Sequence, residues 1–385
     1  MTLNHESRGL ITLDLGMLVL AHGALADGGI KGIMADGERQ GLRGPVKSSV
    51  ITSGPGMMGA EGKTYPEFRS EFSSEFDVDG RVVVTRHRYS NDSYSTTRYD
   101  YDASGRLLKT RSGTEGEANS ETTYFYDQQN RMTEIINSKR PANPVSFRYD
   151  ERGRKSMTVV SLPEDYRPNV ASGGSPFDRA AFPPNLRGGG SATTIYDELD
   201  RAIEAQVRNA NGELIEHTVR TYDAQGRVLE EIQTLDAPER MFSVEQLDEV
   251  RQKQGLSADQ FRQEFRADFA KLMAGRPGMY SVSYRYDSQG RVQHTSRRIL
   301  NTEEDMETLY NERGDVVSEI RWRKELNGGT DSATAAPRPP SFSEVRYSYQ
   351  YDSHGNWTEK TMSVRSSPDG AFEPRCVMTQ TLTYY

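Results

Sequence analysis

Apolar and polar positions alternate with period two in several stretches of this chain. In 280–286 and again in 345–351, aromatic or aliphatic residues occupy every second position and polar residues lie between them. Such alternation is typical of an antiparallel strand with one face more buried than the other. The tyrosines of these faces predict either a buried cross-strand ladder or a ligand-binding platform. They are Tyr280, Tyr284, Tyr286, Tyr347, Tyr349 and Tyr351.

A turn signal follows these strands. The stretch 222–229 reads Tyr-Asp-Ala-Gln-Gly-Arg-Val-Leu, and close copies occur at 101–107 and 286–292. The Asp can accept a hydrogen bond from the backbone two residues on, and the fourth position after the aromatic residue needs a positive φ, which Gly, Asn and Asp tolerate best. We predict a type I turn with a bulge at the tip of a β-hairpin. The turn residues of the clearest copies are Asp102, Gly105, Asp223, Gly226, Asp287, Gly290, Asp352 and Gly355.

Looser copies make this turn a repeat with a base period of about 25 residues. They begin at Phe76, Tyr126, Tyr149, Tyr196, Tyr310 and Tyr351. A period in this range predicts stacked units, each stabilised by its neighbours. An Arg follows the turn in seven of the nine copies. We expect this Arg to pair with a turn Asp of the adjacent repeat; the alternative is an anion-binding stripe.

The motif Tyr-Asp-x-x-Gly-Arg followed by an apolar residue resembles the YD repeat of RHS-repeat proteins, which include bacterial wall-associated proteins and polymorphic toxins. The resemblance covers residues 76 to about 360, with departures at Asn311, Asp315 and Asn356. It implies a long antiparallel β-meander coiled into a curved open sheet or a partial shell. The self-cleaving core and C-terminal toxin domain of the toxin members have no counterpart after Tyr351.

Three insertions interrupt the repeats. Residues 161–190 and 326–341 are rich in Pro and Gly and predict irregular loops. The insertion at 238–278 predicts a helical hairpin, because capping-box patterns stand at 243–246 and 257–260. A phenylalanine stripe at helical spacing follows the second one and predicts either core packing or a partner surface. It consists of Phe261, Phe265 and Phe269.

The N-terminal region predicts a separate organisation. Residues 1–26 combine an apolar run with a final Ala-Leu-Ala, which favours a cleaved secretory signal, although Asp14 and His22 fit a locally packed leader better. Residues 27–64 are glycine-rich and predict a flexible tether to a repeat domain at 65–385. We therefore expect a periplasmic or secreted protein, or a cytoplasmic one if the leader is kept.

Composition limits the chemistry. Only 34% of the 385 residues are hydrophobic, which predicts a thin core, and the net charge of −8 argues against nucleic acid as a partner. Cys376 is the single cysteine, which excludes an intramolecular disulfide, and the six histidines have no metal-ligand spacing. No nucleophile elbow, phosphate-binding loop or apolar span of about 20 residues is present. We predict no catalytic residue, metal, cofactor or transmembrane span.

Two functional classes follow from these observations. The first is a non-catalytic binding or scaffold protein of the cell envelope, or a secreted one, with a carbohydrate or another envelope protein as its partner; the YD-repeat resemblance implies this class. The alternative is a shell fragment derived from a polymorphic toxin, or an effector-associated protein.

Overall fold

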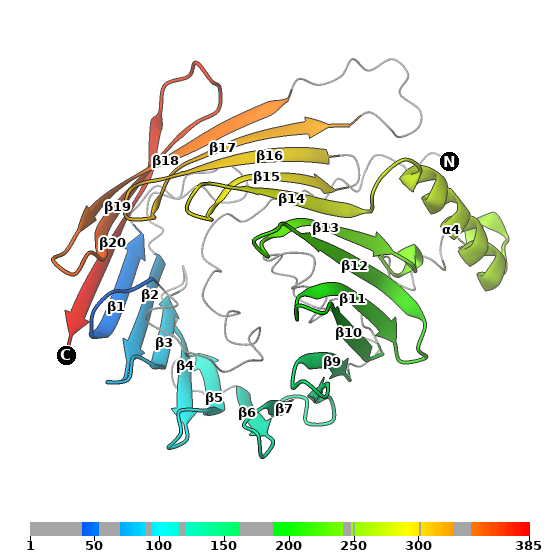
Figure 1. Cartoon of the computed structure of the whole chain (residues 1–385), viewed down its shortest axis with the longest axis horizontal. Coiled ribbons are helices and arrows are strands. Elements are labelled where there is room, and N and C mark those ends of the chain that lie inside the picture. The colour runs from blue at the N-terminus through cyan, green and yellow to red at the C-terminus, as the bar shows by residue number, and fades with distance from the viewer. Residues whose placement is uncertain are drawn as a thin grey trace. The chain divides into compact units, whose positions relative to one another are not determined.

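The structure is a computed structural model that describes residues 41–53, 70–88, 94–114, 120–161, 188–241, 248, 251–299, 302–326 and 340–385. It is mainly β, which confirms the predicted fold class, and every strand pair described below is antiparallel (Figure 1). The described residues form two compact units. Unit 1 lies within Met1–Pro144, Thr308–Ile320 and Phe342–Tyr385, and unit 2 lies within Val145–Glu307 and Arg321–Ser341.

In unit 1 the strands pair in the order β7, β6, β5, β4, β3, β2, β1, β20, β19, β18. Their bounds are β1 Val46–Ser53, β2 Ser70–Phe76, β3 Val82–Arg88, β4 Tyr94–Tyr101, β5 Leu107–Thr114, β6 Ser120–Tyr126, β7 Met132–Asn137, β18 Ser341–Tyr351, β19 Trp357–Arg365 and β20 Glu373–Tyr384.

In unit 2 the strands pair in chain order from β8 to β16. Their bounds are β8 Val145–Tyr149, β9 Lys155–Val160, β10 Gly190–Tyr196, β11 Ala202–Asn209, β12 Leu214–Tyr222, β13 Val228–Leu235, β14 Tyr280–Tyr286, β15 Val292–Ile299 and β16 Thr302–Tyr310. The last residues of β16 and the first of β17 (Val316–Glu325) belong to unit 1.

Strand β1 corrects two predictions. It lies inside the 27–64 segment that we expected to be a flexible tether, and it pairs with β2 on one side and β20 on the other. The glycines on either side of this short strand hid its signal, and its β20 partner lies more than 300 residues away in the sequence. An open sheet, with free edges at the first and last strands, is therefore wrong at this point, because β1 fills the space between β2 and β20.

The nine turns have the geometry that their residue types predict. The N–H of Gly226 donates to the carbonyl of Asp223 at 3.0 Å, the N–H of Asp223 donates to the carbonyl of Arg227 at 2.9 Å, and the pairing register shifts just before Tyr222. All nine fourth positions have positive φ, including Asn130 at 63° and Asp200 at 61°. The seven glycines are Gly80, Gly105, Gly153, Gly226, Gly290, Gly314 and Gly355.

A further turn of this type escaped the sequence pattern. It joins β11 to β12, at the strand ends opposite the motif turns, and Gly212 has φ of 80°. The Oδ1 atom of Asn209 accepts the N–H groups of Asn211 and Glu213 at 3.0 and 2.9 Å. This turn lacks the Tyr and Arg of the motif, so only its Asn and Gly signalled it.

Apolar packing is thin in both units, as the composition predicts. In unit 2 a small aliphatic cluster lies on β9 to β12 and just after β13; it contains Val160, Ala192, Ala205, Val207, Ile215 and Ala237. In unit 1 the cluster joins the two ends of the chain, with Tyr99, Leu382 and Tyr384 packed against it; it contains Leu42, Val46, Phe76 and Val82. Much of the stability must therefore come from contacts between polar groups on neighbouring strands.

The 238–278 insertion is helical where it is described. The 3-10 helix η2 spans Pro238–Met241 and α4 spans Ala258–Met273. Ser257 caps α4, and its capping box with Gln260 is complete. The other capping box, at 243–246, lies outside the described residues, as do the leader 1–26 and most of the insertions 161–190 and 326–341. No helix in the described ranges is long and apolar enough to cross a membrane.

Candidate functional site

Eight of the nine motif turns are organised by an Asp, and Asn311 takes its place in the ninth. In Asp223, Oδ1 accepts the N–H groups of Gln225 and Arg227 at 2.9 and 2.8 Å, and Oδ2 accepts Nε–H of Arg227 at 2.6 Å. Our prediction of a pair with the adjacent repeat is confirmed at Arg154, whose Nη1 lies 2.5 Å from Oδ1 of Asp200, but the pair common to these turns joins the Arg to the Asp of its own repeat. Local geometry explains this, because the two residues are four positions apart in the sequence and the turn places their side chains on the same side. The equivalent pairs are 77–81, 102–106, 127–131, 150–154, 197–201 and 287–291.

The same Arg also contacts the next repeat along the sheet. The guanidinium of Arg227 lies over the ring of Tyr286 with 4.6 Å between the guanidinium carbon and the ring centroid, and the Tyr286 hydroxyl donates to the Val228 carbonyl at 2.7 Å. Cation–π and hydrogen-bond contacts of this kind connect neighbouring turns without a buried apolar core between them. The other stacked pairs are Arg81–Tyr101, Arg106–Tyr126, Arg154–Tyr196 and Arg201–Tyr222.

These turns keep their carboxylates ionised. The backbone N–H of Arg106 and the Ser104 hydroxyl lower the pKa of Asp102 strongly, and the backbone N–H of Arg291 lowers that of Asp287. For Asp223, burial acts to raise the pKa, but hydrogen bonds from Arg227 outweigh it and lower the pKa overall. These Asp residues are therefore ionised at neutral pH and act as hydrogen-bond acceptors.

The candidate tyrosines lie in contact with neighbouring strands. Tyr280 is buried, and burial raises the pKa of Tyr284 and Tyr349. The Tyr349 hydroxyl donates to the carbonyl of Val316 at 2.7 Å. These observations favour the ladder over the binding platform.

Two further tyrosines of this set contact carboxylates. The Tyr347 hydroxyl donates to Glu319 Oε2 at 2.8 Å, and that of Tyr351 donates to Asp315 Oδ2 at 2.7 Å. The Lys360 ammonium lies 4.2 Å from the centroid of the Tyr347 ring. The hydroxyls of these two rings are thus already engaged within the sheet.

Helix α4 is attached to unit 2 at its N-terminal half. Phe261 is buried and its ring centroid lies 5.9 Å from that of Phe265, whereas Phe269 is half-buried. Arg266 donates to Glu239 of η2, with Nη2 to Oε1 at 2.5 Å, and to Glu213 of the 209–213 turn at 2.8 Å. The start of the phenylalanine stripe is therefore core, which favours packing over a partner surface.

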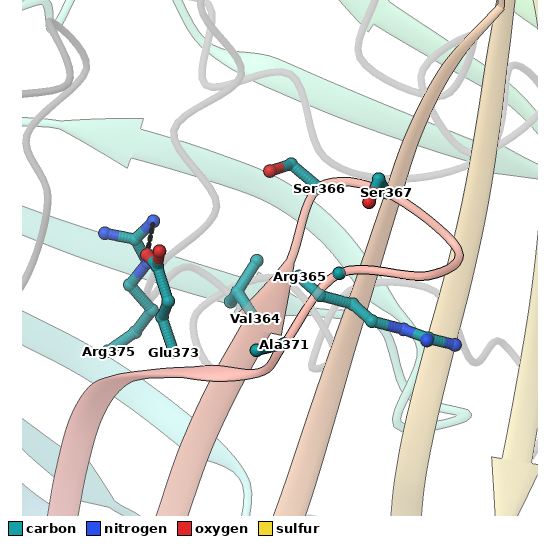
Figure 2. Close-up of a pocket in the computed structure, with 8 residues that line it drawn as sticks. Val364, Arg365, Ser366, Ser367, Ala371, Glu373 and Arg375 are labelled. Atoms are coloured by element: carbon teal, nitrogen blue, oxygen red, sulfur yellow. Dashed lines mark ion pairs between the residues drawn. The ribbon is translucent and has the colours of Figure 1, made fainter.

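A pocket of about 220 Å³ lies at the loop between β19 and β20 in unit 1 (Figure 2). The Glu373 carboxylate and the Arg375 guanidinium form an ion pair at 3.1 Å on one side, and the Ser366 and Ser367 side chains come from the loop. Val364 and Ala371 supply apolar lining. The pocket thus offers donors, acceptors and a small apolar patch.

A buried carboxylate fixes the loop. Glu344 is 2% exposed and accepts hydrogen bonds from Nε–H of Arg346 and of Arg365 at 2.8 and 2.6 Å and from the Ser318 hydroxyl at 3.2 Å. Burial acts to raise the pKa of Glu344, but these donors lower it overall. Both guanidiniums lie over the Phe372 ring, at 4.1 and 4.9 Å. The sequence pattern missed this cluster, because its members come from three strands and share no local motif.

The described residues contain no group of three or more His, Cys, Asp or Glu side chains that could hold a metal ion. Cys376 is buried, and burial raises the pKa of its thiol. The surroundings of Cys376 therefore do not activate its thiol as a nucleophile.

The chain was compared with known proteins. No protein-family model matches it, and no curated protein does. Among solved structures it is similar to a porin-like protein from Bacteroides uniformis, at 9% identity over 89% of this chain and 99% of that chain, with a TM-score of 0.32. It is also similar to the TcdB2-TccC3 structure, at 13% identity over 80% of this chain and 19% of that chain, with a TM-score of 0.25. A porin-like protein from Bacteroides vulgatus gives 9% identity over 88% and 98% of the two chains, with a TM-score of 0.23. Likeness at these scores carries no argument about function.

Proposed function

We propose that this chain is a non-catalytic binding or scaffold protein of the cell envelope, or a secreted one, built from YD-type repeats. The observation that carries the proposal is that the motif side chains contact one another within and between the turns. In seven of the nine turns the motif Asp and Arg pair with each other, and Arg227 stacks on the tyrosine of the next repeat. Because these side chains stabilise the turns, we assign them to a rigid frame. We expect the irregular segments that the frame carries to bind the ligand or partner.

Among the described segments, the pocket between β19 and β20 suits a neutral saccharide. A sugar diol can donate to a carboxylate and accept from a guanidinium, which Glu373 and Arg375 supply, and its C–H face can contact Val364 and Ala371. The volume of about 220 Å³ is below the roughly 300–1,000 Å³ of sites for drug-sized ligands, so one sugar unit is the expected occupant. The loop is pre-organised by Glu344, which lowers the entropy lost on binding.

Retention of the full chain on a glycan array and on isolated envelope fractions tests this proposal. We expect wild-type protein to be retained, and Glu373→Gln and Arg375→Met to bind at least tenfold more weakly. Asp369→Asn is the matched control, because Asp369 belongs to the same loop but does not line the pocket.

Four outcomes separate the claims. Loss in the two pocket variants alone supports the saccharide site. Equal retention of all variants would place binding elsewhere on the chain, and retention by envelope proteins without glycan would favour a protein partner. A wild-type protein retained on none of these materials would refute the binding proposal and leave the toxin-derived alternative.

A further inference from the structure

Strand β1 is joined to β2 differently from the way the two strands of a motif hairpin are joined. Motif hairpins connect paired strands by a five-residue turn, such as 77–81 between β2 and β3. By contrast, residues 54–69 separate β1 from β2, and β1 pairs with β20 at the far end of the chain. A connection of this length can span up to about 50 Å when extended. The chain therefore allows β1 to leave its place without breaking a tight turn.

The seam between β1 and β20 is polar around the middle and end of β1. Ser48 and Thr383 lie with their hydroxyl oxygens 2.6 Å apart, and so do Thr52 and Thr379. Gln380 is 5% exposed and its Nε2 donates to the Ser49 hydroxyl at 2.9 Å, while its buried Oε1 has no hydrogen-bond partner among the described residues. Small hydroxyl pairs and an unsatisfied buried oxygen hold a strand far less firmly than aliphatic packing does.

The N-terminal end of the segment carries its specific contacts. Leu42 and Val46 are 7% and 5% exposed and belong to the apolar cluster with Phe76 and Val82. The Arg43 N–H donates to Oδ1 of Asn356 at 2.7 Å, and Nδ2 of Asn356 donates back to the Arg43 carbonyl at 2.8 Å. The groove between β2 and β20 thus recognises an extended segment by its backbone and by Leu42, Arg43 and Val46.

We propose that residues 41–53 are a separable donor strand, and that the groove between β2 and β20 also accepts the same strand from a second copy of this chain. Backbone pairing along a strand supplies affinity without sequence specificity, and side-chain contacts then choose the partner. The same segment of a second copy carries all of these contacts, so it is the occupant that the groove fits best. Exchange of an identical element between copies is a direct route to a dimer.

The test uses the full chain with Ser48→Cys and Thr383→Cys, whose side chains face each other across the seam. Oxidised glutathione converts the two thiols into one disulfide and is itself reduced to two glutathione molecules. A connecting segment of this length gives the chain's own strand an effective concentration in the millimolar range, so exchange is favoured only when the protein concentration approaches it. We expect a covalent monomer after oxidation at roughly 1 μM, and a covalent dimer fraction at least tenfold higher after long incubation at roughly 1 mM.

A labelled peptide of residues 41–53 provides a second measurement. It should bind the reduced double-cysteine protein and not the oxidised monomer, in which the native strand is locked. Ser48→Cys alone controls for reactions of the buried Cys376. A dimer fraction independent of concentration, or a peptide that binds oxidised and reduced protein alike, would overturn the proposal.

Discussion

The turns at 223–227 and 352–356 share their backbone and differ in what stabilises them. In the first, Arg227 pairs with Asp223 at 2.6 Å and lies over Tyr286. In the second, Asn356 replaces the Arg, and Asp352 instead accepts a very short hydrogen bond from the Tyr384 hydroxyl. The Asp–Arg ion pair of the repeat is thus replaced by hydrogen bonds that Asp352 and Asn356 make with the last strand.

Two guanidiniums lie beside the glycine of the last turn, that of Arg43 from the N-terminal segment and that of Arg313 from the preceding repeat. Nη1 of Arg43 donates to the Gly355 carbonyl at 3.3 Å, and a Cβ atom at Gly355 would lie 2.9 Å from this nitrogen. Arg81 of the first repeat holds the same relation to Gly105, with 2.9 Å to a Cβ at that position. A guanidinium therefore lies beside the turn glycine in both places, although it comes from a motif Arg at Gly105 and from outside the motif at Gly355.

Restoring the motif residue should break the last turn. Asn356 is 3% exposed and makes three hydrogen bonds, two with the Arg43 backbone and one with the Tyr384 hydroxyl. Asn356→Arg removes them and overfills the site, so we expect a loss of about 2–4 kcal/mol in the free energy of unfolding by urea. The reverse change, Arg227→Asn, affects a partly exposed ion pair and should cost about 0–1 kcal/mol. Equal costs would show that the two turns are stabilised alike.

Backbone strain should separate two substitutions at one position. Gly226 has φ of 80° and an added Cβ would meet no atom within 4 Å. Gly226→Val therefore tests conformation alone and should cost about 1–3 kcal/mol. Gly226→Asn should cost only a few tenths, since Asn130 adopts φ of 63° at the same place. Superimposable thermal unfolding curves for the two variants would contradict the turn geometry.

The Asn substitution should be worse in the last turn. At Gly355 the new Cβ would displace Arg43, so Gly355→Asn should cost about 0.5–1.5 kcal/mol more than Gly226→Asn through the lost hydrogen bonds. A double-mutant cycle with Arg43→Ala tests the cause, because the part of the extra cost that comes from Arg43 should vanish once its guanidinium is gone, while Nη1 of Arg313 would still lie 3.2 Å from the new Cβ. Additive effects would mean that Arg43 does not support this turn.

The same contrast explains what the sequence could predict. Turn conformation depends on residues within five positions, so Asp, Gly and even Asn130 and Asp200 signalled it correctly. Strand β1 depends on Thr379 and Thr383, more than 300 residues away, and no local pattern reports such pairing. The Glu344 cluster likewise gathers Arg365 and Phe372 from other segments, and the partner of each motif Arg became clear only from the turn geometry.

The smallest expected effect is the pH dependence of single turns. Hydrogen bonds lower the pKa of Asp223 and Asp352 in the folded protein against the effect of burial, from an unfolded value near 3.9. Between the two values the unfolded chain binds more protons, so each turn contributes stability above about pH 4 that is lost as pH falls through the folded pKa. Asp223→Asn cannot titrate, and its Tm deficit relative to wild type should shrink from pH 7 to about pH 2.5. Asp352→Asn should follow the same trend, although in this turn the Tyr384 hydroxyl is the side-chain donor that lowers the pKa of the Asp. A deficit that stays constant over this range in either variant would show that the carboxylate charge of that turn does not contribute to its stability.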